Sequence, residues 1–226
     1  MFDDKECNHA NNNNNNKFFI SLGNYCLSSM LLKENNIKHD SYPFDWMVNC
    51  IDTVHHCIEN NFSHFLNKEN YLNIDNKTQN KIYFEETNKL FGNLKTDHQH
   101  HNLLDNKDYE YLTRCVERFN NLDKSDKELV FVMIQPLYLN KTFNQYEENK
   151  IKIKNLFNIL KLKFKNNIKL IIFTIKNEDN QTYKEEIIYK NLKIIELDSK
   201  MVKGNYGMMY FDKNGIKKFL EIIQND

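Results

Sequence analysis

Short apolar segments of strand length alternate with amphipathic segments along most of the chain. The strand-like segments are Phe18–Leu22, Leu129–Ile134, Leu170–Ile175 and Lys193–Leu197. Apolar residues at helical spacing mark residues 27–31, 47–66, 108–122, 147–164 and 215–223. Such alternation is typical of a mainly parallel sheet covered by helices on both faces. The pattern therefore predicts an α/β fold with a mostly parallel central sheet, Rossmann-like or flavodoxin-like.

Two segments depart from this alternation. Residues 1–16 end in the tract Asn11–Asn16, and a polar tract of low complexity cannot bury enough apolar surface to fold. We expect a disordered Asn-rich arm at residues 1–16 and a single α/β domain over residues 17–226. Residues 67–106 are polar and irregular apart from a strand expected at Lys81–Phe84. Long irregular stretches inside a compact domain are often functional.

The first predicted strand ends at Gly23, and Asn24 can cap the helix that follows. Cys26 then lies in the first turn of that helix. Backbone N–H groups there are unpaired and the helix dipole favours negative charge, so both lower the pKa of a thiol. The N–H groups from Gly23 to Cys26 can also stabilise an oxyanion. Cys26 is accordingly the candidate nucleophile; the alternative is a cysteine buried behind the strand.

A thiol nucleophile needs a base, and the irregular stretch holds several histidines. His100 and His101 are candidates, because a loop can bring either imidazole over the helix end. Zinc binding and a solvated loop are the alternatives, but no cysteine or carboxylate with ligand spacing is nearby, so we expect no metal. Asp45 can orient the base as a third catalytic residue, or cap the following helix.

Arginines and aromatic residues near these motifs are candidates for contacting a ligand. Arg114 and Arg118 are four residues apart on one helical face, where they can hold a phosphate or carboxylate. Pairing with neighbouring acids such as Asp108 and Glu110 is the favoured alternative. The chain has no glycine-rich phosphate loop, Walker motif or dinucleotide fingerprint, so we expect no cofactor.

Overall charge and cysteine usage limit the possible partners and the cellular location of the protein. The 31 basic residues balance 31 acidic ones, so there is no general signal for nucleic acid, although a local basic patch is not excluded. We find neither an apolar run long enough to cross a bilayer nor a signal peptide. Five cysteines without a Cys-x-x-Cys pair favour reduced thiols. We therefore expect a cytoplasmic protein of open oligomeric state.

Two motifs carry a family resemblance. Phe19–Cys26, which reads Phe-Ile-Ser-Leu-Gly-Asn-Tyr-Cys, and Ser41–Trp46, which reads Ser-Tyr-Pro-Phe-Asp-Trp, resemble the opening of a papain-like cysteine peptidase family of bacteria and large DNA viruses. Residues 114–119 and 129–132 resemble the arginine-rich helix and strand that follow in that family.

The resemblance implies a cysteine-dependent hydrolase or acyl transferase acting on a peptide, glycan or acyl substrate. Cys26 would be the nucleophile, His101 or His100 the base and Asp45 an orienting residue. The residues expected to contact substrate are Gly23, Asn24, Tyr25, Trp46, Arg114 and Arg118. If the protein is viral, host cytoplasm or virion is its expected location. The family name also implies a papain-like α+β fold as an alternative, but the strand before Cys26 favours the parallel sheet.

Two other functions remain open. SGNH-type esterases and acyltransferases also have their nucleophile after the first strand, but they carry serine there and an Asp-x-x-His pair before the last helix. Here Tyr210–Gly215 precedes that helix without the histidine. A non-catalytic module binding a glycan, nucleotide or protein is the other function. An enzyme requires Cys26 exposed and about 3–4 Å from an imidazole, whereas a binding module tolerates a buried Cys26.

Overall fold

The computed structural model describes seven ranges of the chain: residues 16–23, 26–74, 77–85, 100–136, 143–176, 182–203 and 209–225. The Asn-rich arm up to residue 15 lies outside these ranges. So do Asn24 and Tyr25, two of the predicted substrate contacts.

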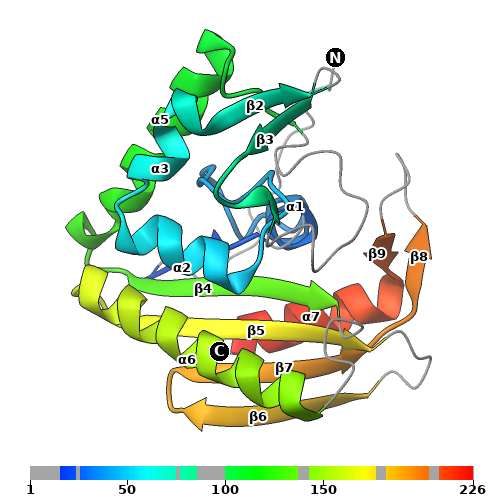
Figure 1. Ribbon diagram of the computed structural model, residues 1–226. Coiled ribbons are helices and arrows are strands. Elements are labelled where there is room, and N and C mark those ends of the chain that lie inside the picture. The colour runs from blue at the N-terminus through cyan, green and yellow to red at the C-terminus, as the bar shows by residue number, and fades with distance from the viewer. Residues whose placement is uncertain are drawn as a thin grey trace, which may run out of the picture.

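A five-stranded sheet forms the centre of the molecule (Figure 1). In spatial order its strands are β1 (Lys17–Ser21), β4 (Glu128–Pro136), β5 (Ile168–Lys176), β7 (Leu192–Asp198) and β6 (Tyr183–Tyr189). The first four run parallel, and β6 pairs antiparallel with β7 at one edge. The predicted α/β fold with a mostly parallel sheet is confirmed.

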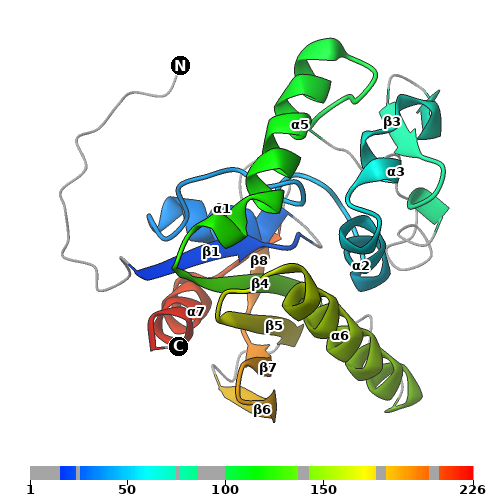
Figure 2. The same cartoon turned by 90° about the vertical axis from the view of Figure 1, so that its left-hand side faces the viewer.

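Helices cover both faces of this sheet (Figure 2). One face packs against α1 (Cys26–Glu34) and α7 (Lys213–Asn225); the other packs against α2 (Ile51–Glu59), α5 (Asn106–Asn120) and α6 (Phe143–Lys163). Neighbouring residues of a strand feed opposite cores: Phe131 belongs to the core under α5 and α6, and Val130 and Val132 to that under α1 and α7. Buried strands therefore read as continuous apolar runs.

Smaller elements complete the described structure. They are α3 (Ser63–Leu66), two 3-10 helices at Lys68–Asn70 and Leu122–Lys124, and two antiparallel pairs, β2 (Tyr71–Ile74) with β3 (Lys77–Asn80) and β8 (Met201–Lys203) with β9 (Met209–Phe211). None of the helices within the described ranges is long and apolar enough to cross a bilayer.

Two predicted elements were wrong in detail. The helix expected over residues 47–66 is broken between α2 and α3, because Asn61 and Phe62 adopt left-handed φ angles of 47° and 61° and the Phe62 N–H bonds the Cys57 carbonyl at 2.8 Å. The strand expected at Lys81–Phe84 is a turn, in which the Asn80 side chain accepts the Ile82 and Tyr83 N–H groups.

The sequence pattern also missed β6. Most of its residues are exposed, so it contains no apolar run like those of the buried strands. Within the described residues it pairs on one side only, and its charged side chains Lys184, Glu185 and Glu186 are typical of an edge strand, where they oppose pairing with another chain.

The parallel strands define two ends of the sheet. Their carboxyl ends lie together at one end, where α/β proteins usually bind ligands. Cys26 follows β1 at this end, three residues after Gly23.

Candidate active site

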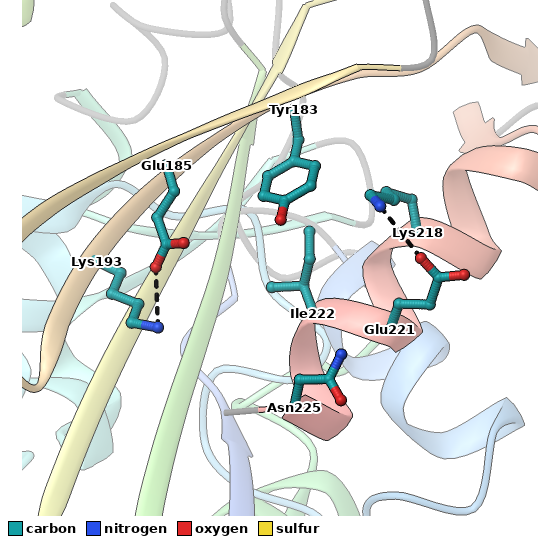
Figure 3. A pocket seen from close by; sticks show the side chains of 7 residues that line it. All are labelled: Tyr183, Glu185, Lys193, Lys218, Glu221, Ile222 and Asn225. Carbon is teal, nitrogen blue, oxygen red and sulfur yellow. Dashed lines mark hydrogen bonds and ion pairs between the residues drawn. The ribbon is translucent and has the colours of Figure 1, made fainter.

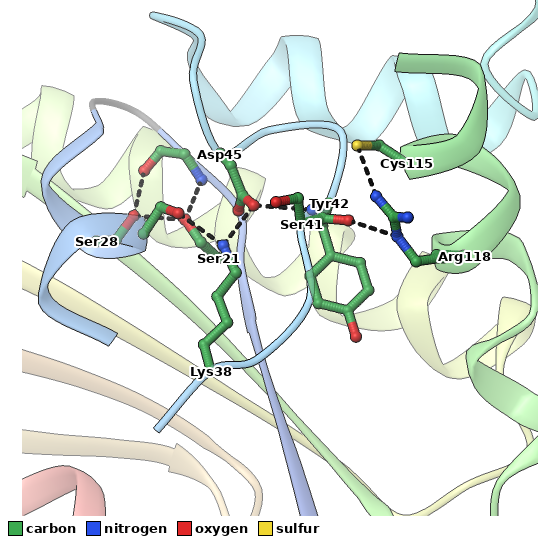
Figure 4. A network of polar contacts seen from close by, with 10 residues as sticks. Ser21, Ser28, Lys38, Ser41, Tyr42, Asp45, Cys115 and Arg118 are labelled. Carbon is green, nitrogen blue, oxygen red and sulfur yellow. Dashed lines mark hydrogen bonds and ion pairs between the residues drawn. The ribbon is translucent and has the colours of Figure 1, made fainter. Parts of the chain in front are cut away.

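The turn after β1 requires a glycine. Gly23 has a φ of +77°, and a Cβ there would lie 2.5 Å from Asn49 Nδ2 and 2.6 Å from the Phe44 carbonyl oxygen. Ser21 Oγ accepts the Gly23 N–H at 3.1 Å, and Ser28 Oγ donates to the Gly23 carbonyl at 3.2 Å (Figure 4). These contacts fix the direction in which α1 leaves the sheet, and with it the position of Cys26.

The structure brings Cys26 to a histidine 74 residues away. Cys26 Sγ lies 3.4 Å from His100 Nε2. The Trp46 indole packs edge-on against the His100 ring, with ring centroids 5.4 Å apart. The imidazole distance expected for an enzyme is met, but the expected exposure of the thiol is not: Cys26 is 1% exposed, whereas His100 is exposed to solvent. Three residues singled out from the sequence, on three segments, therefore meet at the carboxyl end of β1.

The ionisation of Cys26 differs from the sequence-based expectation. Burial raises the pKa of its thiol to about 11, and the charge of Asp45 adds to this, although the cysteine's own backbone N–H works in the opposite direction. The expected lowering by the helix N-terminus is therefore wrong for this structure, because desolvation outweighs the N–H groups. At neutral pH the sulfur is a protonated thiol beside an imidazole.

His101 has a different environment from its neighbour. Its Nδ1 lies 3.3 Å from Asp108 Oδ1, and its ring stacks on Tyr111 with centroids 4.6 Å apart. The other Asp108 oxygen accepts the Asn102 N–H at 2.7 Å. Asp108 thus anchors the histidine segment to the first turn of α5, and of the two candidate bases it is His100 that contacts the sulfur.

Asp45 lies in a buried polar network and contacts neither histidine. It is completely buried, forms an ion pair with Lys38 and accepts the Tyr42 N–H at 2.8 Å (Figure 4). Lys38 also donates to Ser29 Oγ at 2.6 Å. Burial raises the pKa of the Asp45 carboxyl, and the charge of Lys38 opposes that rise. The proposed orienting role has no hydrogen bond to support it; Asp45 instead stabilises its own loop against α1.

The two arginines of α5 face a groove of about 460 Å³ that neither Cys26 nor His100 lines. Arg118 is half-buried and donates from Nε to the Ser41 carbonyl at 3.0 Å and from Nη2 to Cys115 Sγ at 3.1 Å. Arg114 is exposed. Within the described ranges neither forms the alternative ion pairs with Asp108 and Glu110, since Asp108 binds the histidine segment instead.

Three residues near the site, Asn49, Asp108 and Tyr111, had no catalytic or binding role in the sequence-based prediction. Asn49 is completely buried and donates to the Leu22 carbonyl at 3.2 Å, joining its loop to the end of β1. A polar residue inside the apolar run Met47–Ile51 was the available signal. Asp108 and Tyr111 were detectable only as a pair three residues apart in the first turns of α5.

A family comparison agrees with the motifs. The family described as "Putative papain-like cysteine peptidase (DUF1796)" matches residues 17–151, more than half of the 226-residue chain. The chain belongs to this family. The match extends from β1 into α6 and so includes the segments of Cys26, Trp46 and His100. No curated protein and no solved structure matches the chain. The family description thus suggests a class of reaction, but it does not say which residues carry it out.

Proposed function

We propose that this protein is a cysteine-dependent hydrolase or acyl transferase acting on an amide or ester, with Cys26 as nucleophile and His100 as base. The observation that carries the proposal is the 3.4 Å contact between Cys26 Sγ and His100 Nε2. Contact between a thiol and an imidazole is the arrangement that nucleophilic catalysis requires. Its place at a helix start beside the carboxyl end of a strand adds backbone donors.

The raised pKa of the thiol determines the first step. Because the sulfur is protonated at neutral pH, its proton passes to His100 Nε2 as the sulfur attacks the substrate carbonyl carbon. The Gly23 N–H is held by Ser21, so the oxyanion receives the N–H groups of the first turn of α1, beginning at Cys26. The imidazolium then protonates the leaving amine or alcohol, which leaves a thioester on Cys26.

The second step releases the acyl group. His100 takes a proton from water, or from an acceptor alcohol or amine, as this nucleophile attacks the thioester carbonyl. The sulfur leaves and recovers its proton from the imidazolium, so each proton returns to its starting group. Attack by water makes the protein a hydrolase, and attack by an acceptor makes it a transferase.

The residues around Cys26 Sγ are the expected substrate contacts. Trp46 packs against His100 and is half-buried, so an apolar part of the substrate can lie along it. Arg114 and Arg118 are offered as a more distant subsite for a carboxylate or phosphate. Gly23, Asn24 and Tyr25 remain predicted contacts at the turn.

Alkylation of Cys26 by iodoacetamide tests the pair directly, because the reaction needs no known substrate. We expect His100→Ala to slow labelling of Cys26 at pH 7.5 by about 100-fold, the usual minimum for a general base. The site of labelling is identified by peptide mass spectrometry. His101→Ala is the matched control, since it removes the neighbouring ring, which contacts Asp108. Equal labelling of the His100 variant and the unmodified protein would refute the assignment.

Burial of the thiol favours a second candidate, a non-catalytic binding module. A cysteine that is 1% exposed is also the expected finding for a packing residue. Cys26→Ser separates the two, because it retains the shape and removes the thiolate chemistry: a ligand-binding module keeps its function, and an enzyme loses turnover. The SGNH-type alternative gains no support, since Asp212 accepts the Gly215 N–H at 2.8 Å at the start of α7.

A further inference from the structure

A second groove, of about 640 Å³, lies at the end of the sheet opposite to Cys26. Its walls come from the end of α6, the residues that lead into β5, and the turn between β6 and β7, all at the left of Figure 1. Because β5 and β7 run parallel to β1, their amino ends lie away from the end that carries Cys26. The groove is therefore separate from the proposed active site.

Three lysines give this groove a positive charge. Lys161, Lys165 and Lys190 line it together with four asparagines, and no lining residue is acidic. All three lysines are exposed, and none forms an ion pair with any residue in the described ranges. The helix dipole accounts for lysines at the end of α6. It does not account for Lys190, which comes from the turn between β6 and β7.

In a second cavity of the protein, by contrast, the lysines have acidic partners. The small cavity of about 130 Å³ between β6 and α7 also contains two lysines (Figure 3). There Lys193 pairs with Glu185 at 2.9 Å, and Lys218 pairs with Glu221 at 3.2 Å. Lys161 lies over the Phe157 ring, 5.7 Å from its centroid, but none of the three lysines of the larger groove has an acidic partner among its lining residues. Three lysines gathered without an acid indicate a place for an anion.

The groove also has an aromatic wall. Phe157 is buried, and Tyr189, which is 49% exposed, stacks against it with ring centroids 6.1 Å apart and 23° between the planes. The buried Phe157 ring covers one face of the Tyr189 ring and holds it in place. A planar group of a ligand can therefore stack on a tyrosine that is already held in position.

Carboxamides supply directional hydrogen bonds beside this wall. Asn191 Nδ2 donates to Asn167 Oδ1 at 3.0 Å, and Asn167 Nδ2 donates to Glu128 at 2.6 Å, so both side chains are held in place. Asn166 donates to the carbonyls of residues 125 and 127, while its own Oδ1 has no partner within the described ranges. A ligand with both donors and acceptors would fit these amides.

We propose that this groove binds a phosphorylated nucleoside, with the phosphates at Lys161, Lys165 and Lys190 and the base against Tyr189. The volume lies within the usual range for small-molecule sites. Lysines are common phosphate ligands, and aromatic rings stack on bases of any sequence. The nucleotide is either free or one unit of a single strand. This function does not depend on the reaction at Cys26.

Binding is measured on the full chain with three probes: ATP, inorganic pyrophosphate and a ten-nucleotide oligothymidylate, each at two salt concentrations. We expect ATP or the oligonucleotide to bind, and the affinity to fall at higher salt. Tighter binding of the oligonucleotide identifies a strand as the source, and tighter binding of ATP a free nucleotide. Pyrophosphate should bind at least tenfold more weakly than the better probe, because it lacks a base to stack.

Matched variants complete the test. Lys161→Gln with Lys190→Gln, and separately Tyr189→Ala, should each weaken binding about tenfold. Lys213→Gln with Lys217→Gln removes two exposed lysines from α7, on the other face of the sheet, and should change little. Absence of binding, an equal loss in the α7 control, or equal affinity for pyrophosphate with no effect of Tyr189→Ala would overturn the proposal. Cys26 alkylation should be unchanged in every variant, so failure here leaves the proposed catalytic pair untouched.

Discussion

The ionisable side chains at and near Cys26 are largely removed from water. Cys26 and Asp45 are both buried, and burial raises the pKa of each. The charge of Asp45 raises the pKa of the Cys26 thiol further. Lys38 neutralises Asp45, so the polar network is stable only while its members remain together. At this scale the environment of a side chain, more than its chemical type, determines what it can do.

The raised pKa of Cys26 predicts a dependence of stability on pH. From about pH 9 upward an unfolded chain ionises this thiol, whereas the folded protein keeps it protonated until the pH passes its folded pKa of about 11. The contribution is fully present below pH 9 and is lost between pH 9 and 11. Urea unfolding should therefore show a loss of about 3 kcal/mol in this window that Cys26→Ser lacks. Parallel pH curves for the two proteins would contradict the burial of the thiol.

The buried ion pair predicts a large effect of a single substitution. Asp45→Ala leaves the Lys38 ammonium without its partner in a dry site, which typically costs about 3–5 kcal/mol of the free energy of unfolding. Lys38→Met combined with Asp45→Asn should recover much of this loss, because no charge then stays buried. The exposed pair Lys152–Asp52, at 2.5 Å, is the control, and Asp52→Ala should cost less than about 1 kcal/mol. Similar costs for the two pairs in urea unfolding would show that the Asp45 site is solvated.

Secondary elements bring the catalytic candidates together. The helix α1 begins at Cys26, the loop before α2 carries Trp46, and the first turn of α5 holds the histidine segment through Asp108. Each element is positioned by its own apolar face, and the site arises where their ends meet.

The anchoring of the histidine segment can be tested at this scale. Asp108→Ala removes the acceptor of the Asn102 N–H and the partner of His101, so His100 should contact Cys26 less often. We expect Cys26 alkylation at pH 7.5 to slow several-fold, with little change in thermal stability because Asp108 is a partly exposed side chain. Glu110→Ala removes an exposed acid from the same helix and serves as the control. An unchanged alkylation rate would mean that other contacts position His100.

The whole molecule places its two candidate sites at opposite ends of one sheet. A parallel arrangement places all its carboxyl ends at one end, where the Cys26–His100 contact lies, and all its amino ends at the other, where the lysine groove lies. Net charge gave no sign of the groove, because acidic residues elsewhere cancel its lysines in the total. Only their positions in space reveal an unpaired cluster.

The sequence by itself determined the fold class, the alternation of the parallel strands with helices and the place of Cys26 at the start of a helix after the first strand. These follow from local periodicity, from a glycine at the end of the first strand and from two short motifs. It left open which histidine meets the sulfur and predicted the wrong direction for the thiol pKa. It also treated residues 47–66 as one helix and overlooked β6.

Only the tertiary structure decided those points, because each depends on residues distant in the chain. His100 and His101 are equivalent in sequence until Asp108 binds one and the other turns to Cys26. The thiol pKa depends on burial under segments that periodicity cannot position. The local sequence pattern indicates which face of a helix or strand is apolar. How far a side chain is removed from water, and which residue it contacts, depends on the packing of the whole molecule.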